Sequence, residues 1–249
     1  MSNNKIVFSS VKTTSKVTAD ELEVDSDGYY TLNLGALNAF NSAGAYYALA
    51  GSKDLFESNA VLMRRIKNGY LRSEVGHPKK LPGMTFADYV NRITTIDLNN
   101  VCAHIKEVWL ENGKGDTVIT KGKIKPLGPK ANVLESILKE KEANVAFSVR
   151  SLTKDTVQNG IVVKTMTNIV TWDFILEGGM EDASKWKTLG IESIELLSID
   201  LEDKETINEV IDGLKSVKNI GNEDNVEMLD IVKNLLDCSK NNSCIIHDW

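Results

Sequence analysis

The chain has 249 residues, of which 42% are hydrophobic and 26% are charged, so it can bury a full globular core. No apolar run reaches the roughly 20 residues of a transmembrane helix, and the first sixteen residues lack the apolar centre of a secretory signal. We therefore expect no transmembrane helix and no membrane partner. We expect the chain to stay in the cytoplasm where it is made.

Cysteine and histidine are scarce in this sequence. The three residues of each type are Cys102, Cys238 and Cys244, and His77, His104 and His247. Their wide spacing favours reduced thiols over a disulfide framework, and without a CxxC or HExxH motif we expect no structural metal. The sequence also lacks a phosphate-binding loop and a basic stripe, so it predicts no cofactor and no nucleic-acid partner.

The net charge of −6 is unevenly distributed along the chain. Residues 1–180 carry 22 Lys and Arg against 19 Asp and Glu, which leaves a charge of −9 on residues 181–249. Gly178 and Gly179 supply a flexible joint close to this change of composition. We therefore predict a main domain over residues 1–180 and an acidic extension over residues 181–249.

The acidic extension contains two stretches in which apolar residues recur at helical spacing. They are residues 205–217, with Ile207, Val210, Ile211 and Leu214 on one face, and residues 226–236, with Leu229, Val232, Leu235 and Leu236. Amphipathic helices need a partner surface. That surface is either the main domain or another protein, and the negative charge favours a basic partner.

In the main domain, predicted strands outnumber predicted helices. Strands are expected at residues 29–34, 101–110, 117–125, 143–152, 160–166 and 168–176, and at Tyr70 running into the loop around His77; helices are expected at 55–66 and 132–142, and a loop or short helix at 35–49. The 117–125 strand should pair antiparallel with 101–110 across the turn NGKGD. The pattern predicts an α+β fold with a mainly antiparallel, barrel-like core and surrounding helices, plus the helical extension.

The strand at 143–152, ANVAFSVRSL, carries polar side chains in an otherwise apolar stretch. Successive side chains alternate between the two faces of a strand, so Ser148 and Arg150 share a face, about 7 Å apart at about 3.3 Å per residue. Ser148 is therefore a candidate nucleophile. Ser151 is the rival hydroxyl, but it belongs to the other face, with Val149.

His77 and Asp173 are the other candidates for a catalytic site. Pro78 disfavours helix at His77, which places this histidine at a strand end or in a loop, where it can reach a neighbour. Asp173 lies in an apolar strand, where an unpaired carboxylate would be costly to bury, so we expect it to have a specific partner. Peptide hydrolysis by serine needs a base, a group that orients the base and donors for the oxyanion.

These segments together resemble the prohead maturation proteases of tailed bacteriophages, which share the fold of the herpesvirus assemblin serine proteases. The resemblance rests on the order and spacing of EVGHP at 74–78, the 101–110 strand, the 132–142 helix, FSVRS at 147–151 and the strand holding Asp173. It implies a serine endopeptidase with Ser148 as nucleophile, His77 as general base and Asp173 orienting the histidine. It also implies that Arg150 helps to form the oxyanion site.

The chain departs from the family pattern at two places. Ala146 and Ser151 stand where the family has glycines, and residues 177–179 stand where a Pro-Ser pair follows the aspartate strand. His104 is an alternative partner for His77, because assemblin-type proteases use a second histidine. In those proteins the second histidine follows the serine strand, whereas His104 precedes it, so we expect His104 to be a packed histidine.

The resemblance further implies a protease that cleaves phage scaffold, core and capsid proteins inside the assembling prohead, in the host cytoplasm. From the sequence we expect neither nucleic acid nor membrane as a partner. Such proteases are made as precursors that cleave themselves, often after glutamate, and Glu177, Glu192 and Glu195 lie near the start of the extension. We therefore expect self-cleavage between residues 177 and 209. The alternative is a head-assembly protein that retains the fold without catalysis, which the replaced glycines favour. The oligomeric state stays open, a homo-oligomer included.

Overall fold

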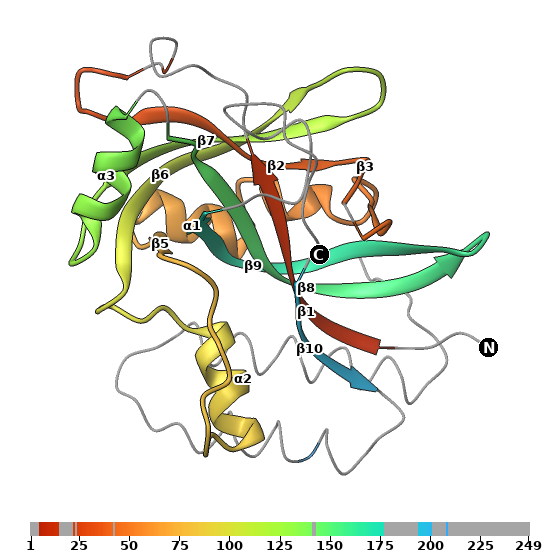
Figure 1. The fold of residues 1–249 in the computed structure, drawn as a ribbon. Coiled ribbons are helices and arrows are strands. Elements are labelled where there is room, and N and C mark those ends of the chain that lie inside the picture. The colour runs from red at the N-terminus through yellow and green to blue at the C-terminus, as the bar shows by residue number, and fades with distance from the viewer. Residues whose placement is uncertain are drawn as a thin grey trace.

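The computed structural model describes residues 5–14, 22, 24–41, 43–140, 143–176, 194–200 and 208, with the backbone alone at 5–14 and 194–200. Within these ranges the chain forms two β-sheets, three α-helices and one 3-10 helix (Figure 1).

The larger sheet has six strands in the order β10-β1-β8-β9-β4-β3. They are β1 (Lys5–Thr14), β3 (Ala39–Phe40), β4 (Tyr46–Tyr47), β8 (Ala146–Gln158), β9 (Ile161–Ile175) and β10 (Ile194–Asp200). Neighbouring strands are antiparallel except β4 and β9, which are parallel. The strand that carries the candidate nucleophile, β8, therefore lies between β1 and β9, inside the sheet.

The smaller sheet has four antiparallel strands in the order β2-β7-β6-β5. They are β2 (Tyr30–Leu37), β5 (Arg72–Glu74), β6 (Val101–Asn112) and β7 (Val118–Pro126). The hydrophobic core contains side chains from both sheets, with Leu34 and Ile105 from the smaller sheet and Phe147 and Trp172 from the larger one. One core thus holds the two sheets together.

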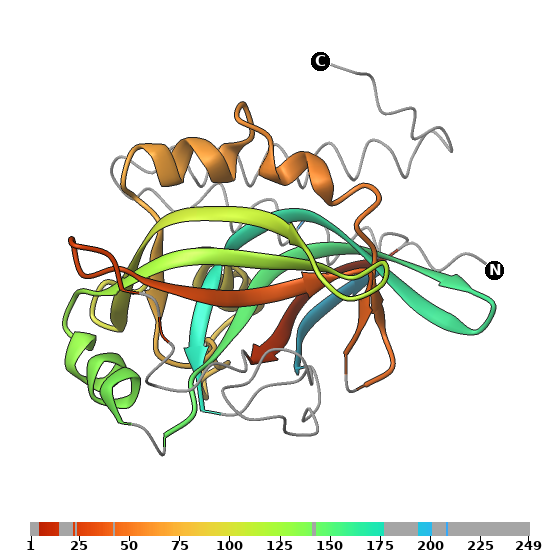
Figure 2. The same cartoon turned by 90° about the horizontal axis from the view of Figure 1, so that it is seen from above.

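Four helical segments surround the sheets. They are η2 (Lys53–Phe56), α1 (Val61–Lys67), α2 (Phe86–Thr94) and α3 (Ala131–Lys139). The α1 helix packs on β6 and β9, whereas α3 packs on β6 and β7, on the other side of the body (Figure 2). Within the residues given above, no helix is long and apolar enough to cross a membrane.

Most predicted strands of the main domain and the helix predicted at 132–142 are confirmed, with shifted ends, whereas the helix predicted at 55–66 is divided between η2 and α1. The segments at 160–166 and 168–176 form one long strand, β9, and residues 35–49 contain the short strands β3 and β4. Five elements were not predicted: β1, β3, β4, β10 and α2. The α2 helix does carry a sequence signal, because Thr85 and Asp88 form a capping box at its start.

The barrel-like part of the predicted fold is wrong. The strands that the structure describes form two separate sheets of six and four strands, and neither sheet closes on itself. Of the two helices predicted in the acidic extension, only residue 208 is among the described residues, so these helices are not supported. The extension does contribute β10, which pairs with β1 at the edge of the larger sheet. The domain division at residue 180 stays a prediction.

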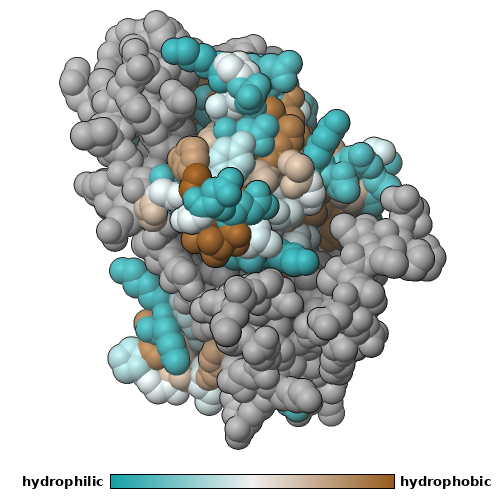
Figure 3. All heavy atoms as spheres, turned by 90° about the vertical axis from the view of Figure 1, so that its right-hand side faces the viewer, coloured by the Kyte–Doolittle hydropathy of each residue, from teal (hydrophilic) through white to brown (hydrophobic). Residues whose placement is uncertain are grey.

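The β8–β9 hairpin extends beyond the rest of the larger sheet (Figures 1 and 2). Its two-residue turn is Asn159–Gly160, in which both residues have positive φ, as a type I′ turn requires. Val157 near the tip is 69% exposed. The face seen from this side shows small apolar groups among hydrophilic residues (Figure 3).

The loop that carries His77 leaves β5 and is attached to β9 at its first residues. Val75 forms a parallel bridge with Phe174, and the Gly76 N–H donates a 2.6 Å hydrogen bond to the Phe174 carbonyl. Gly76 has a φ of +71°, a conformation that glycine adopts without steric cost. The loop therefore meets the sheet beside Asp173.

We expect Gly76→Ala to destabilise the protein by about 1–2 kcal/mol, because an L-residue with this φ is strained. A Cβ at this position would meet no atom within 4 Å, so backbone strain alone causes the loss. Urea unfolding measures it. Gly83→Ala is the matched control, since Gly83 in the same loop has φ +84° and an equally open site.

Both variants should lose similar stability, but only Gly76→Ala should also move the NMR signals of the His77 ring. Unchanged stability in Gly76→Ala would contradict this account.

Candidate active site

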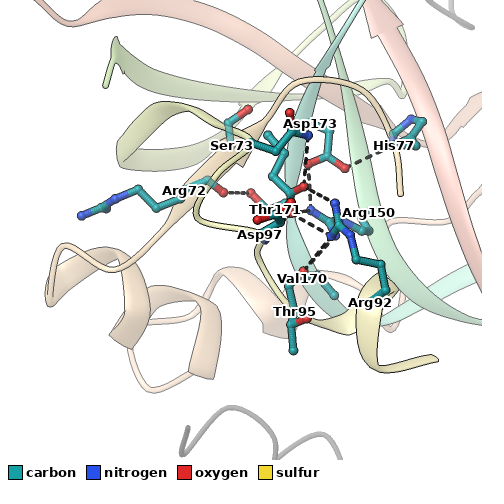
Figure 4. Close-up of polar contacts among 12 residues, drawn as sticks. Arg72, Ser73, His77, Arg92, Thr95, Asp97, Arg150, Val170, Thr171 and Asp173 are labelled. Carbon is teal, nitrogen blue, oxygen red and sulfur yellow. Dashed lines mark hydrogen bonds and ion pairs between the residues drawn. The ribbon is translucent and has the colours of Figure 1, made fainter. Parts of the chain in front are cut away.

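His77 and Asp173 meet in the structure as the sequence predicts. His77 Nδ1 lies 3.1 Å from Asp173 Oδ2, and the two side chains are 6% and 0% exposed. An ionised carboxylate only accepts hydrogen bonds, so the histidine donates from Nδ1 and keeps Nε2 as the basic nitrogen. The carboxylate of Asp173 points to His77 on one side and to Arg150 on the other (Figure 4).

Ser148 lies directly opposite Asp173 in the β8–β9 pairing. Side chains at such cross-strand positions have Cβ atoms about 4.5–5.5 Å apart on the same face of a sheet. The serine is fully buried, and on its other side β1 pairs Lys12 with it. The rival Ser151 lies opposite Ile169, beyond an irregularity in the pairing, and therefore has no carboxylate across from it.

Arg150 contacts carboxylates on two strands. Its Nη2 lies 2.9 Å from Asp173 Oδ1 and 2.9 Å from Glu74 Oε1, and its Nη1 donates to the Thr95 carbonyl at 3.1 Å. Its Nε has no hydrogen-bond partner in the described part of the chain. The predicted oxyanion role is not tested by these contacts, which assign the terminal nitrogens to Asp173, Glu74 and Thr95.

Glu74 was not predicted as a site residue, although it is the acidic residue of EVGHP. Its carboxylate is fully buried and accepts from both terminal nitrogens of Arg92, a residue of α2. It also accepts from the Asp97 backbone N–H at 3.0 Å and from Asn100 Nδ2 at 3.3 Å. A polar segment that reads as a loop in the sequence thus supplies most of the partners of Glu74.

Burial alone would raise the pKa of Asp173, but the charge of Arg150 and the hydrogen bond from His77 outweigh it. The pKa of Asp173 therefore lies below its ordinary value. The carboxylate stays ionised at neutral pH and can hold the histidine in one orientation.

His104 belongs to a different cluster, as expected. Its Nδ1 lies 2.9 Å from the Tyr29 hydroxyl, and the two rings meet edge to face. Burial and the nearby charges of Arg72 and Lys106 lower its pKa, so it is neutral at physiological pH. The contacts of His104 thus support a packed histidine.

A metal site is not found where the structure describes the chain, because no three His, Cys, Asp or Glu side chains gather there as ligands. The Cys102 thiol is buried near Ser73, and burial raises its pKa to about 12. A thiol with this pKa is not a nucleophile at neutral pH.

Asp173→Asn should lower the free energy of unfolding at pH 7 by about 3–5 kcal/mol, because it leaves the buried Arg150 with one carboxylate fewer. Because the pKa of Asp173 is lower in the folded protein than in the unfolded chain, its carboxylate stabilises the fold at a pH above its unfolded pKa of about 3.9. This stabilisation is lost as the pH falls through the folded pKa. The difference between the two proteins should therefore shrink below about pH 4.

Urea unfolding between pH 3 and 7 measures this difference. Asp27→Asn is the control, because Asp27 forms an exposed ion pair with Lys106 and should contribute less than about 1 kcal/mol. A constant difference for Asp173→Asn over this range would contradict the assignment of the buried charge.

Comparisons with known proteins show the family to which the chain belongs. The Peptidase S80 family model matches residues 8–235. A protein named capsid maturation protease, from Pseudomonas phage phiKZ, is 38% identical over 201 residues, which cover 78% of this chain and 74% of the relative. The structure of the bacteriophage T4 capsid assembly protease is 13% identical, with a TM-score of 0.45 over 70% of this chain and 99% of that one. The family match and the phiKZ relative show that the chain belongs to the Peptidase S80 family.

Proposed function

We propose that this protein is a serine endopeptidase with Ser148 as nucleophile, His77 as general base and Asp173 as the residue that orients the histidine. The observation that carries the proposal is the hydrogen bond between His77 and Asp173, with Ser148 directly opposite Asp173 in the sheet. Family membership supports peptidase activity, and Ser148, His77 and Asp173 are the groups that a serine mechanism requires.

In this mechanism His77 Nε2 accepts the proton of the Ser148 hydroxyl while the serine oxygen attacks the peptide carbonyl. Asp173 stabilises the imidazolium that forms and holds the ring in the required tautomer. The histidine then returns the proton to the leaving amine, and water hydrolyses the acyl-enzyme in a second, similar step. Oxyanion support from Arg150 stays a prediction, because its terminal nitrogens already contact Glu74, Asp173 and the Thr95 carbonyl.

The phiKZ relative suggests the substrates, because it is named a capsid maturation protease. We infer that this protein cleaves scaffold, core or capsid proteins of an assembling phage head, and that it acts inside the prohead in the host cell.

A second candidate function is a structural head-assembly protein without catalysis. The observation that favours it is the complete burial of Ser148, because a peptide bond reaches a buried hydroxyl only after a neighbouring segment moves. The same burial fits a closed precursor of an active protease. Incubation of the purified chain separates the two, since only a protease generates new termini.

Ser148→Ala and His77→Ala should each abolish proteolysis while the protein stays folded, because the residues of a catalytic triad act as a unit. Asp173→Asn should lose on the order of 10³- to 10⁴-fold in rate. The assay detects new termini by gel and mass spectrometry. His104→Ala is the control, and it should lose far less; retained cleavage in Ser148→Ala would refute the assignment.

We further propose that the protein removes part of its acidic extension by cleaving itself after a glutamate between residues 177 and 209. Glu195 lies within β10, where the backbone register pairs it with Ser9. Cleavage at Glu195 therefore requires β10 to leave the sheet first, since a protease binds its substrate as an accessible extended segment. We expect the first cut at a glutamate outside this strand.

The intact mass of the purified wild-type chain should decrease over hours, whereas that of Ser148→Ala should not. Sequencing of the released peptide identifies the glutamate. A chain ending near residue 180 is the companion experiment, because it lacks β10. If that shorter chain fails to fold, the extension is part of the core and its loss by self-cleavage is the wrong reading.

A further inference from the structure

Four charged side chains form a buried chain behind the candidate catalytic residues. In order of contact they are Arg92, Glu74, Arg150 and Asp173, and Asp173 contacts His77. The two carboxylates are fully buried, and Arg92, the outermost member, is 22% exposed. We refer to these four residues as the buried charge chain.

The centre of this chain is a single nitrogen, Arg150 Nη2, which contacts both Glu74 and Asp173 at 2.9 Å. The positive charge of Arg150 is therefore shared between two carboxylates. Five donor contacts hold the Glu74 carboxylate, from Arg92 (two), Arg150, the Asp97 N–H and Asn100. So many donors fix both the place of this carboxylate and its ionised form.

We propose that Glu74 is a positioning residue for catalysis, which holds Arg150 in place and offsets its charge so that Arg150 does not cancel the negative charge of Asp173 that acts on His77. This inference rests on the proposed role of His77 and Asp173. Glu74 itself contacts neither the histidine nor the serine in the contacts given above, so it acts through Arg150.

Glu74 affects His77 through the charge balance around Arg150. If Arg150 faced Asp173 alone, the pair would be neutral as seen from His77, and the protonated imidazole would lose much of its stabilisation. With Glu74 present, the guanidinium of Arg150 is shared between two carboxylates. The positive charge of Arg92, on the far side of Glu74, balances the one negative charge that remains. Removal of Arg150 has the opposite effect, because Asp173 would then act on His77 without a counter-charge.

Charged groups from several elements contact one another within the buried charge chain. Against Asp173 lie His77 from the loop and Arg150 from β8, and against Glu74 lie Arg92 from α2 and Arg150. The Cys102 thiol from β6 is also near both carboxylates, but burial raises its pKa to about 12 and it stays neutral.

The chain also connects α2 to the site. Thr95, the C-cap of α2, accepts hydrogen bonds at its carbonyl from Arg150 at 3.1 Å and from Arg92 at 3.4 Å. The end of a helix carries partial negative charge, which favours two cations there. The α2 helix follows the His77 loop, so the same contacts tie down the far end of the segment that presents the histidine.

The test is an NMR titration of the His77 ring in the Ser148→Ala background, with ¹³C-labelled histidine. The titration does not require proteolysis, and the Ser148→Ala protein lacks the candidate nucleophile. The result is therefore independent of whether Ser148 cleaves peptides. The chain has three histidines, and His77→Gln identifies the signal. Relative to this background, Glu74→Gln should lower the titration midpoint of His77 by at least about half a pH unit, and Arg150→Gln should raise it by a similar amount.

A merely structural role would not produce shifts of opposite sign, so equal or absent shifts overturn the proposal. Arg72→Gln is the matched control, because Arg72 lies on the same strand as Glu74 but faces His104. It should raise the midpoint of His104 and leave that of His77 unchanged.

A single substitution in a buried ion cluster can unfold a protein. The charge-balanced variant Glu74→Gln/Arg92→Gln removes one charge of each sign and provides a second test of the proposal. It still leaves Arg150 facing Asp173 alone, so it should also lower the His77 midpoint. A wild-type midpoint in this double variant would refute the role of Glu74.

Discussion

The structure depends on one buried guanidinium, that of Arg150, placed between the carboxylates of Glu74 and Asp173. Removing a charge from water costs several kcal/mol even after relaxation, so each of these groups is tolerated only while its partners are in place. The three residues come from β8, β5 and β9, which belong to two different sheets. The requirement that all three charges meet therefore fixes how the smaller sheet sits on the larger one, beyond what the apolar core alone would specify.

The catalytic candidates were predictable because each carries a local signal. A proline follows His77, an apolar strand surrounds Asp173, and the period of two puts Ser148 and Arg150 on one face. The expectation that Asp173 has specific partners agrees with its contacts to His77 and Arg150. What a single strand pattern does not contain is the register: a shift by one residue would remove Ser148 from its place opposite Asp173.

The parts that sequence reasoning missed are those whose partners lie far away along the chain. Strand β1 is rich in serine, threonine and lysine, and its place in the sheet comes from pairing with β8 and β10. The α2 helix is short and amphipathic, and its importance for Glu74 appears only when Arg92 contacts this residue of β5 in the folded chain. The barrel expectation failed for a related reason, since strand patterns indicate that sheets form but not where each sheet ends.

The pairing of β1 with β8 also bears on the order of events during synthesis. The register joins Lys12 near the start of the chain to Ser148, so most of the main domain must be made before this contact can form. Contacts of such long sequence separation form slowly, because loop closure has to be overcome first. The neighbour β10 arrives later still. The sheet around the serine is thus completed only after residue 200 has left the ribosome, which gives a newly made chain an interval in which Ser148 does not yet have its full surroundings.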